Sequence, residues 1–154
     1  MSTSKVAIIM GSTSDKEVMA NCEKYLDFFG IEYDVAILSA HRNPEKTMTF
    51  SREAESNGYQ LIIAAAGMAA HLPGVVTANT TLPVIGVPLA GSALNGVDAL
   101  YSIVQMPKGV PVGTMGIGKS GAINAAVYAA EILALQNSVI KKKLIEFKKM
   151  GCKL

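Results

Sequence analysis

Short apolar runs alternate with longer segments of helical periodicity along this chain, and no other feature limits its fold as strongly. The runs at residues 6–10, 33–38, 61–65, 84–87 and 112–115 predict five strands, each followed by a turn rich in Gly, Ser or Pro. Such alternation is typical of βαβ units, in which helices cover both faces of a parallel sheet. We therefore predict an α/β fold with a three-layer, doubly wound, five-stranded parallel sheet.

Start and stop signals place the helices between these runs. An apolar stripe over about residues 15–29 ends at Gly30. Asn43 followed by Pro44 marks the start of a second helix, which we expect to stop at residues 57–58. Further helices are expected to begin near His71, near Asn95 and after Ser120.

Length and composition fit one globular domain over residues 1–154, because half of the residues are hydrophobic and can form a substantial core. An extra C-terminal helix is predicted over about residues 138–150. Its apolar stripe, Ile140, Leu144 and Phe147, would pack at a subunit interface or within the subunit itself.

Charge and cysteine content limit the partners and the compartment. The formal net charge is only +2 and many lysines lie in the C-terminal segment, so no nucleic-acid surface is predicted. The first apolar run is too short for a signal peptide or a membrane span. Cys22 and Cys152 make no disulfide framework. We therefore expect a cytoplasmic protein without a membrane partner.

The first loop after a strand suits a phosphate group. Ligands of open parallel sheets bind at the carboxyl ends of the strands, which directs attention to these loops. Residues 11–15 offer a tight turn, the hydroxyls of Ser12 and Ser14, and a helix N-terminus whose free amides attract anions. Alternatively, Ser14 and Glu17 form a capping box, and the two interpretations are compatible.

The second loop holds Ser39, His41 and Arg42. Histidine exchanges protons near neutral pH, and the arginine fork binds phosphate or carboxylate at two points. A structural interpretation stays open, in which His41 bonds a backbone carbonyl and Arg42 is a solvated charge. The three residues together at the end of a strand favour a functional site.

The third loop runs from Gly67 to Gly74 and contains His71 among small residues. Its exposed amides would suit a small carboxylate. Small side chains would equally serve close packing of a helix on the sheet, so the motif alone leaves the two interpretations undecided.

Three other kinds of chemistry have little support. Residues 113–120 satisfy the Walker A pattern, but they follow the last strand, and no strand ends in an aspartate that would hold magnesium. Two histidines and two cysteines give no metal-ligand spacing, so no metal site is predicted. A serine hydrolase is disfavoured because the G-x-S-x-G elbow is missing.

Over nearly its whole length the chain resembles the class I 5-(carboxyamino)imidazole ribonucleotide mutases of bacterial purine synthesis. The landmarks are residues 11–15, 39–42, 69–74, 83–88 and 102–107. The related class II carboxylases typically have lysine at the position of Arg42, so the arginine favours the mutase. Ala65 and Met68 stand where the family leads us to expect glycine, so the third loop is expected to differ in shape.

The resemblance implies a flavodoxin-like sheet and an isomerase of purine (IMP) biosynthesis that moves a carboxylate from an exocyclic nitrogen to a ring carbon, without a cofactor. His41 would serve as the single acid and base, and Asp15 would accept hydrogen bonds from the ribose. The phosphate would be bound by Ser12, Ser14, Ser39 and Arg42. The carboxylate and the released carbon dioxide would be held by the amides of Ala69, Ala70, His71 and Leu72, with His71 shaping the pocket rather than moving protons, and Gly67 would also bind the substrate. The family also forms a homo-octamer with shared sites.

Three rival interpretations stay open. A class II carboxylase would use free carbon dioxide and aminoimidazole ribonucleotide. A flavodoxin-like electron carrier is disfavoured because the chain has no tryptophan and few aromatic residues to hold a flavin. A non-enzymatic nucleotide-binding module would need neither His41 nor a closed pocket.

Overall fold

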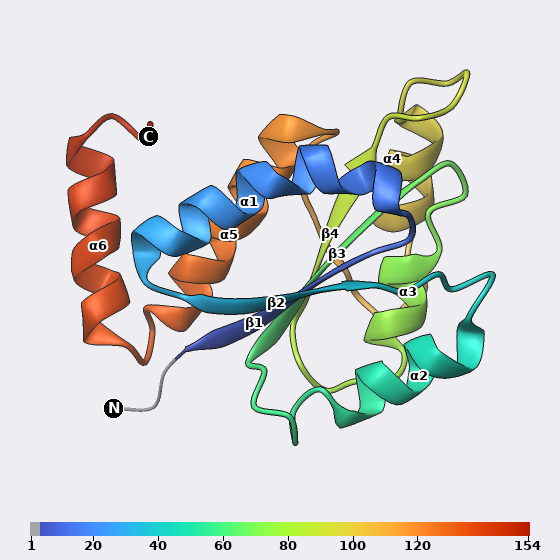
Figure 1. Ribbon diagram of the computed structural model, residues 1–154, viewed down its shortest axis with the longest axis horizontal. Coiled ribbons are helices and arrows are strands. Elements are labelled where there is room, and N and C mark those ends of the chain that lie inside the picture. Colours follow the sequence, from blue (N-terminus) through green and yellow to red (C-terminus); the bar gives the residue numbers. More distant parts are fainter. Residues whose placement is uncertain (1–3) are drawn as a thin grey trace.

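Five parallel strands form one sheet in the order β2-β1-β3-β4-β5 in the computed structural model, which describes residues 4–154 (Figure 1). The strands are β1 (Lys5–Met10), β2 (Glu32–Ile37), β3 (Leu61–Gly67), β4 (Val84–Leu89) and β5 (Gly113–Thr114). From β1 the chain passes to β2 on one side and then to β3, β4 and β5 on the other. The predicted doubly wound sheet is confirmed, and its order reverses between β1 and β3, where such folds bind ligands.

Helices cover both faces of this sheet. One face carries α1 (Lys16–Phe29) and α5 (Lys119–Leu133), with α6 (Ser138–Lys149) packed outside them (Figure 1). The opposite face carries α2 (Pro44–Glu53), α3 (Leu72–Thr77) and α4 (Val97–Val104). A short 3-10 helix, η1 (Thr13–Asp15), precedes α1. The three predicted layers are therefore present.

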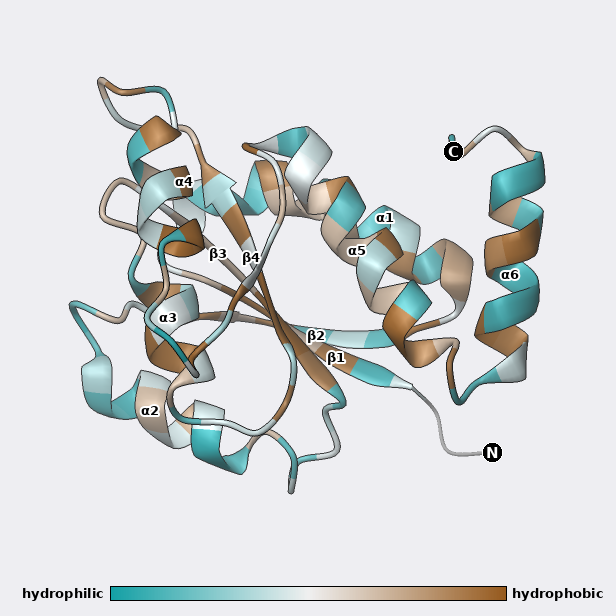
Figure 2. Cartoon of the chain, turned by 180° about the vertical axis from the view of Figure 1, so that it is seen from behind, coloured by the Kyte–Doolittle hydropathy of each residue, from teal (hydrophilic) through white to brown (hydrophobic). Residues whose placement is uncertain are grey.

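Alternation along β1 divides the core into two clusters. Val6, Ile8 and Met10 face the side of α1 and α5, whereas Ala7 and Ile9 face the side of α2, α3 and α4, and all five are fully buried. The central strands β3 and β4 are buried on both faces, so they read as continuous apolar runs. Edge strand β2 is only partly buried, and it is paler than the brown central strands in Figure 2.

The C-terminal helix uses its apolar stripe within the chain. Phe147 lies edge-on to Tyr25 and Phe29 of α1, with ring centroids 5.8 and 5.4 Å apart. The alanine-rich face of α5 is likewise buried, and it packs against α1, where small side chains let the two helices approach closely. These contacts fix α6 and α5 against the same helix.

Element boundaries differ from the predicted ones at turns. α2 ends at Glu53 rather than near Asn57, because the chain continues as turns until Gly58 adopts a φ of +87°. α4 begins at Val97, directly after Gly96 in the left-handed conformation. Strand β5 is only two residues long, shorter than its apolar run suggests.

Candidate active site

A cavity of about 450 Å³ opens at the carboxyl edge of the sheet. Met10 pairs with Ile37 on one side and Ala65 on the other, so β1, β2 and β3 end together and their loops meet there. The predicted site residues that line it are Ser12, Ser14, Asp15, Ser39, His41, Arg42, Gly67, Ala69, His71 and Leu72. Ala70 is the exception, because it is buried and lies outside the lining.

The first loop is held by hydrogen bonds among its own polar groups. The Ser12 hydroxyl accepts from the Ser14 N–H at 3.3 Å and from the Ser14 hydroxyl at 2.9 Å. The Ser12 N–H donates to the Asp15 carboxylate at 3.2 Å. The capping box therefore joins Ser12 to Asp15 rather than Ser14 to Glu17. Both serines are exposed beside the start of a helix, an arrangement suited to an anion.

Asp15 is the one carboxylate among the described residues that line the cavity. Burial raises the pKa of its carboxyl group above the usual value, although hydrogen bonds from the Ser12 N–H and the Ser14 hydroxyl favour the charged form. A partly buried carboxylate of this kind is a strong acceptor for a sugar hydroxyl.

The second loop forms a closed turn. The Ser39 hydroxyl accepts from the Arg42 N–H, and the Asn43 side chain accepts from the Ser39 N–H, both at 3.1 Å. Asn43 precedes α2 as predicted, but its side chain turns back to Ser39 instead of capping the helix. His41 and Arg42 are exposed in the cavity, and no carboxylate between residues 4 and 154 pairs with Arg42. The guanidinium is thus free to bind an anion.

His41 and His71, which are 30 positions apart, touch each other in the cavity. His41 Nε2 lies 2.7 Å from His71 Nδ1, and the rings are perpendicular with centroids 4.8 Å apart. Only one proton can occupy this bond, so one ring donates and the other accepts. The pair therefore carries at most one positive charge while the bond is intact, and the tautomer of each ring determines that of the other.

The third loop presents fewer free amides than predicted. The Ala70 N–H donates to the Met68 carbonyl at 2.9 Å and the His71 N–H donates to the Ala69 carbonyl at 2.7 Å. Within residues 4–154, the N–H groups of Ala69 and Leu72 have no protein acceptor, so these two remain for a carboxylate.

Close packing explains another part of this loop. A Cβ atom on Gly67 would come within 3.1 Å of the Leu89 carbonyl oxygen. Met68 adopts a φ of +56°, a left-handed conformation that glycine tolerates far better than methionine. Gly67 thus allows the loop to pack closely against Leu89, and Met68 has an unusual backbone conformation.

Some apolar residues of the lining were not predicted from the sequence. Ala40, Ala66, Met68, Ala90 and Gly91 line the cavity, and none bears a titratable group. Ala90 and Gly91 follow β4, so their place at the carboxyl end of a strand was the signal that could have identified them.

The Walker-like stretch lies outside this cavity. The Gly118 N–H, which a phosphate loop would present to its ligand, donates to the Pro88 carbonyl at 2.8 Å. A Cβ atom on Gly121 would collide with the Gly116 carbonyl, so this glycine allows a close backbone approach at the start of α5. The Walker-like stretch therefore lies away from the cavity, and the Gly118 N–H is already paired within the protein.

Neither cysteine belongs to the site. Cys22 is fully buried in the core, where burial raises the pKa of its thiol, and Cys152 is exposed near the C-terminus. In the described part of the chain, no three His, Cys, Asp or Glu side chains group in a way that could hold a metal ion.

The fold and the cavity define a class: doubly wound α/β proteins with a pair of contacting histidines beside an arginine and serine hydroxyls at the switch point of the sheet. The AIR carboxylase family model matches residues 5–153, and the chain belongs to this family. The resemblance seen in the sequence landmarks is confirmed.

Curated relatives match most of the chain. The N5-carboxyaminoimidazole ribonucleotide mutase of Escherichia coli (strain K12) is 51% identical over 145 residues, which cover 94% of this chain and 86% of that protein. The mutase of Pyrococcus abyssi (strain GE5 / Orsay) is 53% identical over 144 residues, with coverages of 94% and 82%.

Solved structures agree with the fold. PurE of Treponema denticola superposes with a TM-score of 0.87 at 30% identity, covering 96% of this chain and 91% of that one. A 3-dehydroquinate dehydratase-like protein from Bifidobacterium longum has a TM-score of 0.51 at 14% identity, covering 84% of this chain and 99% of that one, and shares the fold alone.

Proposed function

We propose that this chain is an isomerase of purine biosynthesis that converts N5-carboxyaminoimidazole ribonucleotide into 4-carboxy-5-aminoimidazole ribonucleotide. The carrying observation is the exposed His41, bonded to His71 in a cavity that also contains Arg42 and the serine-rich start of α1. One small cavity therefore combines an acid–base group with groups that bind anions. Relatives about half identical to this chain bear the mutase name.

The proposed orientation of the substrate follows from the charges in the cavity. Arg42, Ser39 and the two loop serines, Ser12 and Ser14, bind the phosphate. Asp15 accepts from the ribose hydroxyls. The free amides of Ala69 and Leu72 hold the carboxylate, and the ring then lies near the histidine pair.

His41 is proposed to donate one proton to the substrate and later to take one proton from it. It protonates the exocyclic nitrogen as the bond from that nitrogen to the carboxylate carbon breaks, which leaves the bonding electron pair on nitrogen and releases carbon dioxide. The neighbouring ring carbon then attacks carbon dioxide with its electron pair and forms the new carbon–carbon bond. The proton on that ring carbon returns to His41, so the overall reaction is an isomerisation.

His71 is proposed to be a positioning residue. Its bond to His41 at 2.7 Å fixes the orientation and the tautomer of the ring that carries the proton. His71 also forms part of the cavity wall, and exclusion of water there protects the carbon dioxide intermediate.

A class II carboxylase that takes up free carbon dioxide is the second candidate, and Arg42 argues against it. Carbon-13 NMR separates the two. The protein is given substrate labelled in its carboxylate in excess unlabelled bicarbonate, beside a protein-free control. Label retained in the ring carboxylate supports the mutase, product made only from unlabelled bicarbonate supports the carboxylase, and no product above the control contradicts both.

We also propose a homo-octamer with sites shared between subunits, working in the cytoplasm. Leu94, Val97, Tyr101 and Val104 are exposed apolar residues spaced three and four apart, which places them on one face of α4 and its preceding turn. Such a face suits a second copy of this chain.

The cytoplasmic location has its own support. The unpaired cysteines fit a reducing compartment, and none of the helices between residues 4 and 154 could cross a membrane.

A further inference from the structure

Met68 combines two features that ordinarily disfavour a methionine. Its φ of +56° lies in the left-handed region, which costs a residue with a Cβ atom about 1–2 kcal/mol. The residue is 61% exposed, so its side chain gains little from burial in the core. Backbone strain of this kind concentrates at functional sites, where it serves a bound ligand rather than the empty protein.

The position of Met68 within the cavity indicates what it serves. Among the described residues that line the cavity, the apolar ones are small, apart from Met68 and Leu72. Leu72 is only 3% exposed, so Met68 is the one long apolar side chain in the described lining that can reach a ligand. The described lining has no Phe, Tyr or Trp on which a base could stack.

The loop fixes the backbone of Met68 and leaves its side chain free. The Met68 carbonyl accepts from the Ala70 N–H at 2.9 Å, and the following Ala69 carbonyl accepts from the His71 N–H at 2.7 Å. A methionine side chain has three rotatable bonds and a polarisable sulfur that makes favourable contacts with aromatic rings. A rigid anchor with a flexible thioether is suited to covering one face of a flat ligand.

We propose that Met68 is a ligand-contacting residue whose thioether packs on the face of the aminoimidazole ring. The inference rests on the proposed function, because it takes the five-membered aromatic ring of the ribonucleotide as the occupant of the cavity. The contact adds to the polar contacts that bind the phosphate and the ribose, and it orients the reacting ring toward His41 and His71.

Methyl NMR tests this contact directly. The chain has eight methionines, and the methyl group of Met68 is identified by its loss in Met68→Leu after labelling with [methyl-13C]methionine. Aminoimidazole ribonucleotide is expected to move the Met68 signal upfield through the ring current. Ribose 5-phosphate, which lacks the ring, is expected to leave that signal in place.

Binding by calorimetry gives the matching energetic test. Met68→Gly keeps a residue that tolerates the left-handed backbone and removes only the side chain, so it is expected to bind aminoimidazole ribonucleotide about tenfold more weakly, equivalent to about 1.4 kcal/mol. Its affinity for ribose 5-phosphate should be unchanged. Met68→Leu keeps an apolar side chain of similar volume and is expected to stay within about threefold of the parent for both ligands.

The outcomes separate the two proposals. If aminoimidazole ribonucleotide binds but the Met68 methyl signal stays in place, or if Met68→Gly weakens both ligands equally, the Met68 contact is wrong and the proposed function stands. If neither ligand binds the parent protein, the proposed function itself fails. Met68→Gly should unfold at the same or a higher temperature, since it relieves strain, and Met68→Ala gives the same binding test if it does not.

Discussion

At the scale of single residues, His41 separates turnover from binding. His41→Asn keeps a polar side chain but cannot exchange protons at neutral pH, so we expect the catalytic rate to fall by at least about 100-fold. Binding of the ribonucleotide should stay within about tenfold, because Arg42, the loop serines and the backbone amides supply the affinity. Product formation at saturating substrate and calorimetric binding measure the two effects.

The matched control for this prediction is Arg42→Gln, which should show the opposite pattern. Losing the guanidinium weakens binding of the phosphate, while the rate at saturation changes less. A parallel loss of binding and rate in His41→Asn would refute its role as the proton carrier.

The contact between His41 and His71 gives a second prediction at this scale. His71→Ala removes the partner of His41 Nε2, so we expect the catalytic rate to fall by about five- to tenfold, as for a lost hydrogen bond of about 1 kcal/mol. His71→Asn places an amide at similar reach and should recover most of that loss, with little change in KM for either variant. Equal losses in the two variants would show that His71 acts only as part of the cavity wall.

These residues also show which features of the site can be predicted from the sequence. His41, Arg42 and the serines were identifiable because each bears a chemical group in a loop at the end of a strand. The bond between His41 and His71 was not, because it depends on side-chain rotamers across 30 positions of sequence. The backbone of Met68 was not identifiable either, since a left-handed methionine is disfavoured locally and persists only in a particular tertiary context.

At the scale of elements, we predict that a Gly→Ala substitution at the start of α5 lowers stability, although such a substitution in a helix usually raises it. Gly→Ala in a helix normally stabilises a protein by up to about 1 kcal/mol. Gly121→Ala should instead destabilise this protein by about 1–3 kcal/mol, because the new methyl group would collide with the Gly116 carbonyl. Urea unfolding measures the difference, and Ser120→Ala, at an exposed neighbouring position, should change stability little. Stabilisation by Gly121→Ala would contradict the close backbone approach inferred at the start of α5.

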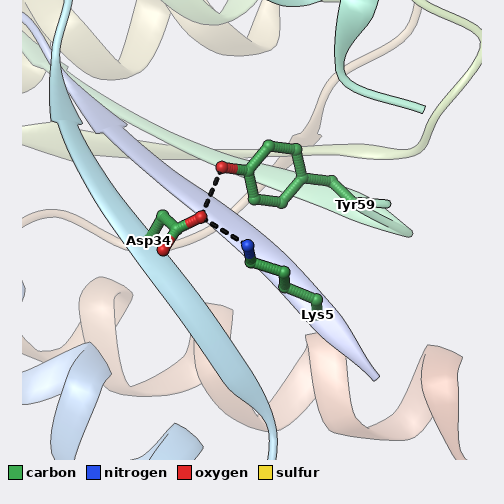
Figure 3. Close-up of polar contacts among 3 residues, drawn as sticks. All are labelled: Lys5, Asp34 and Tyr59. Carbon is green, nitrogen blue, oxygen red and sulfur yellow. Dashed lines mark hydrogen bonds and ion pairs between the residues drawn. The ribbon is translucent and has the colours of Figure 1, made fainter. Parts of the chain in front are cut away.

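A polar cluster joins the edge of the sheet at the opposite end from the cavity (Figure 3). The Lys5 ammonium lies 2.7 Å from Asp34 Oδ2, and the Tyr59 hydroxyl donates to the same oxygen at 2.6 Å. Hydrogen bonds from Lys5 and Tyr59 hold the pKa of Asp34 below its usual value, while burial and the Asp34 carboxylate raise the pKa of Tyr59 to about 12. The cluster ties β1 to edge strand β2 and to the segment entering β3.

This cluster should make stability depend on pH in the acid range. Because the pKa of Asp34 is lower in the folded than in the unfolded chain, its stabilisation is complete above about pH 4 and is lost as the pH falls through the folded value. Asp34→Asn should therefore be less stable than the parent at neutral pH by at most about 1 kcal/mol, since the Asp34 side chain is 53% exposed. Urea unfolding at pH 7 and in acid should show the difference shrinking, and a difference that does not change with pH would contradict this role.

Elements as a whole were easier to predict than their ends. β3 and β4 are buried on both faces, so their continuous apolar runs marked them clearly, and the order of strands and helices followed from the alternation. β5 was overestimated because its apolar run extends beyond the two residues that pair with β4. Pairing at the edge of a sheet depends on tertiary contacts that a local pattern does not contain.

At the scale of the whole molecule, the open cavity and the exposed apolar face of α4 both bear on how the carbon dioxide intermediate is enclosed. The cavity is open at the carboxyl edge, whereas an intermediate such as carbon dioxide needs enclosure. The loop after β4 contributes Ala90 and Gly91 to the cavity and then leads into the exposed apolar face of α4. A second subunit bound on that face would lie beside the cavity and could help to close it, which connects assembly to turnover.

The last prediction concerns this assembly. Light scattering after size-exclusion chromatography should give the parent protein eight times the chain mass of 16.2 kDa. Leu94→Glu combined with Tyr101→Glu places charges on residues that are 62% and 63% exposed, so the fold should survive while the assembly dissociates and activity falls. Leu135→Glu, at a leucine that is 83% exposed beyond α5, is the control that should keep the parent mass. A parent mass of a single chain would contradict the octamer, and an intact assembly in the double variant would exclude α4 as its interface.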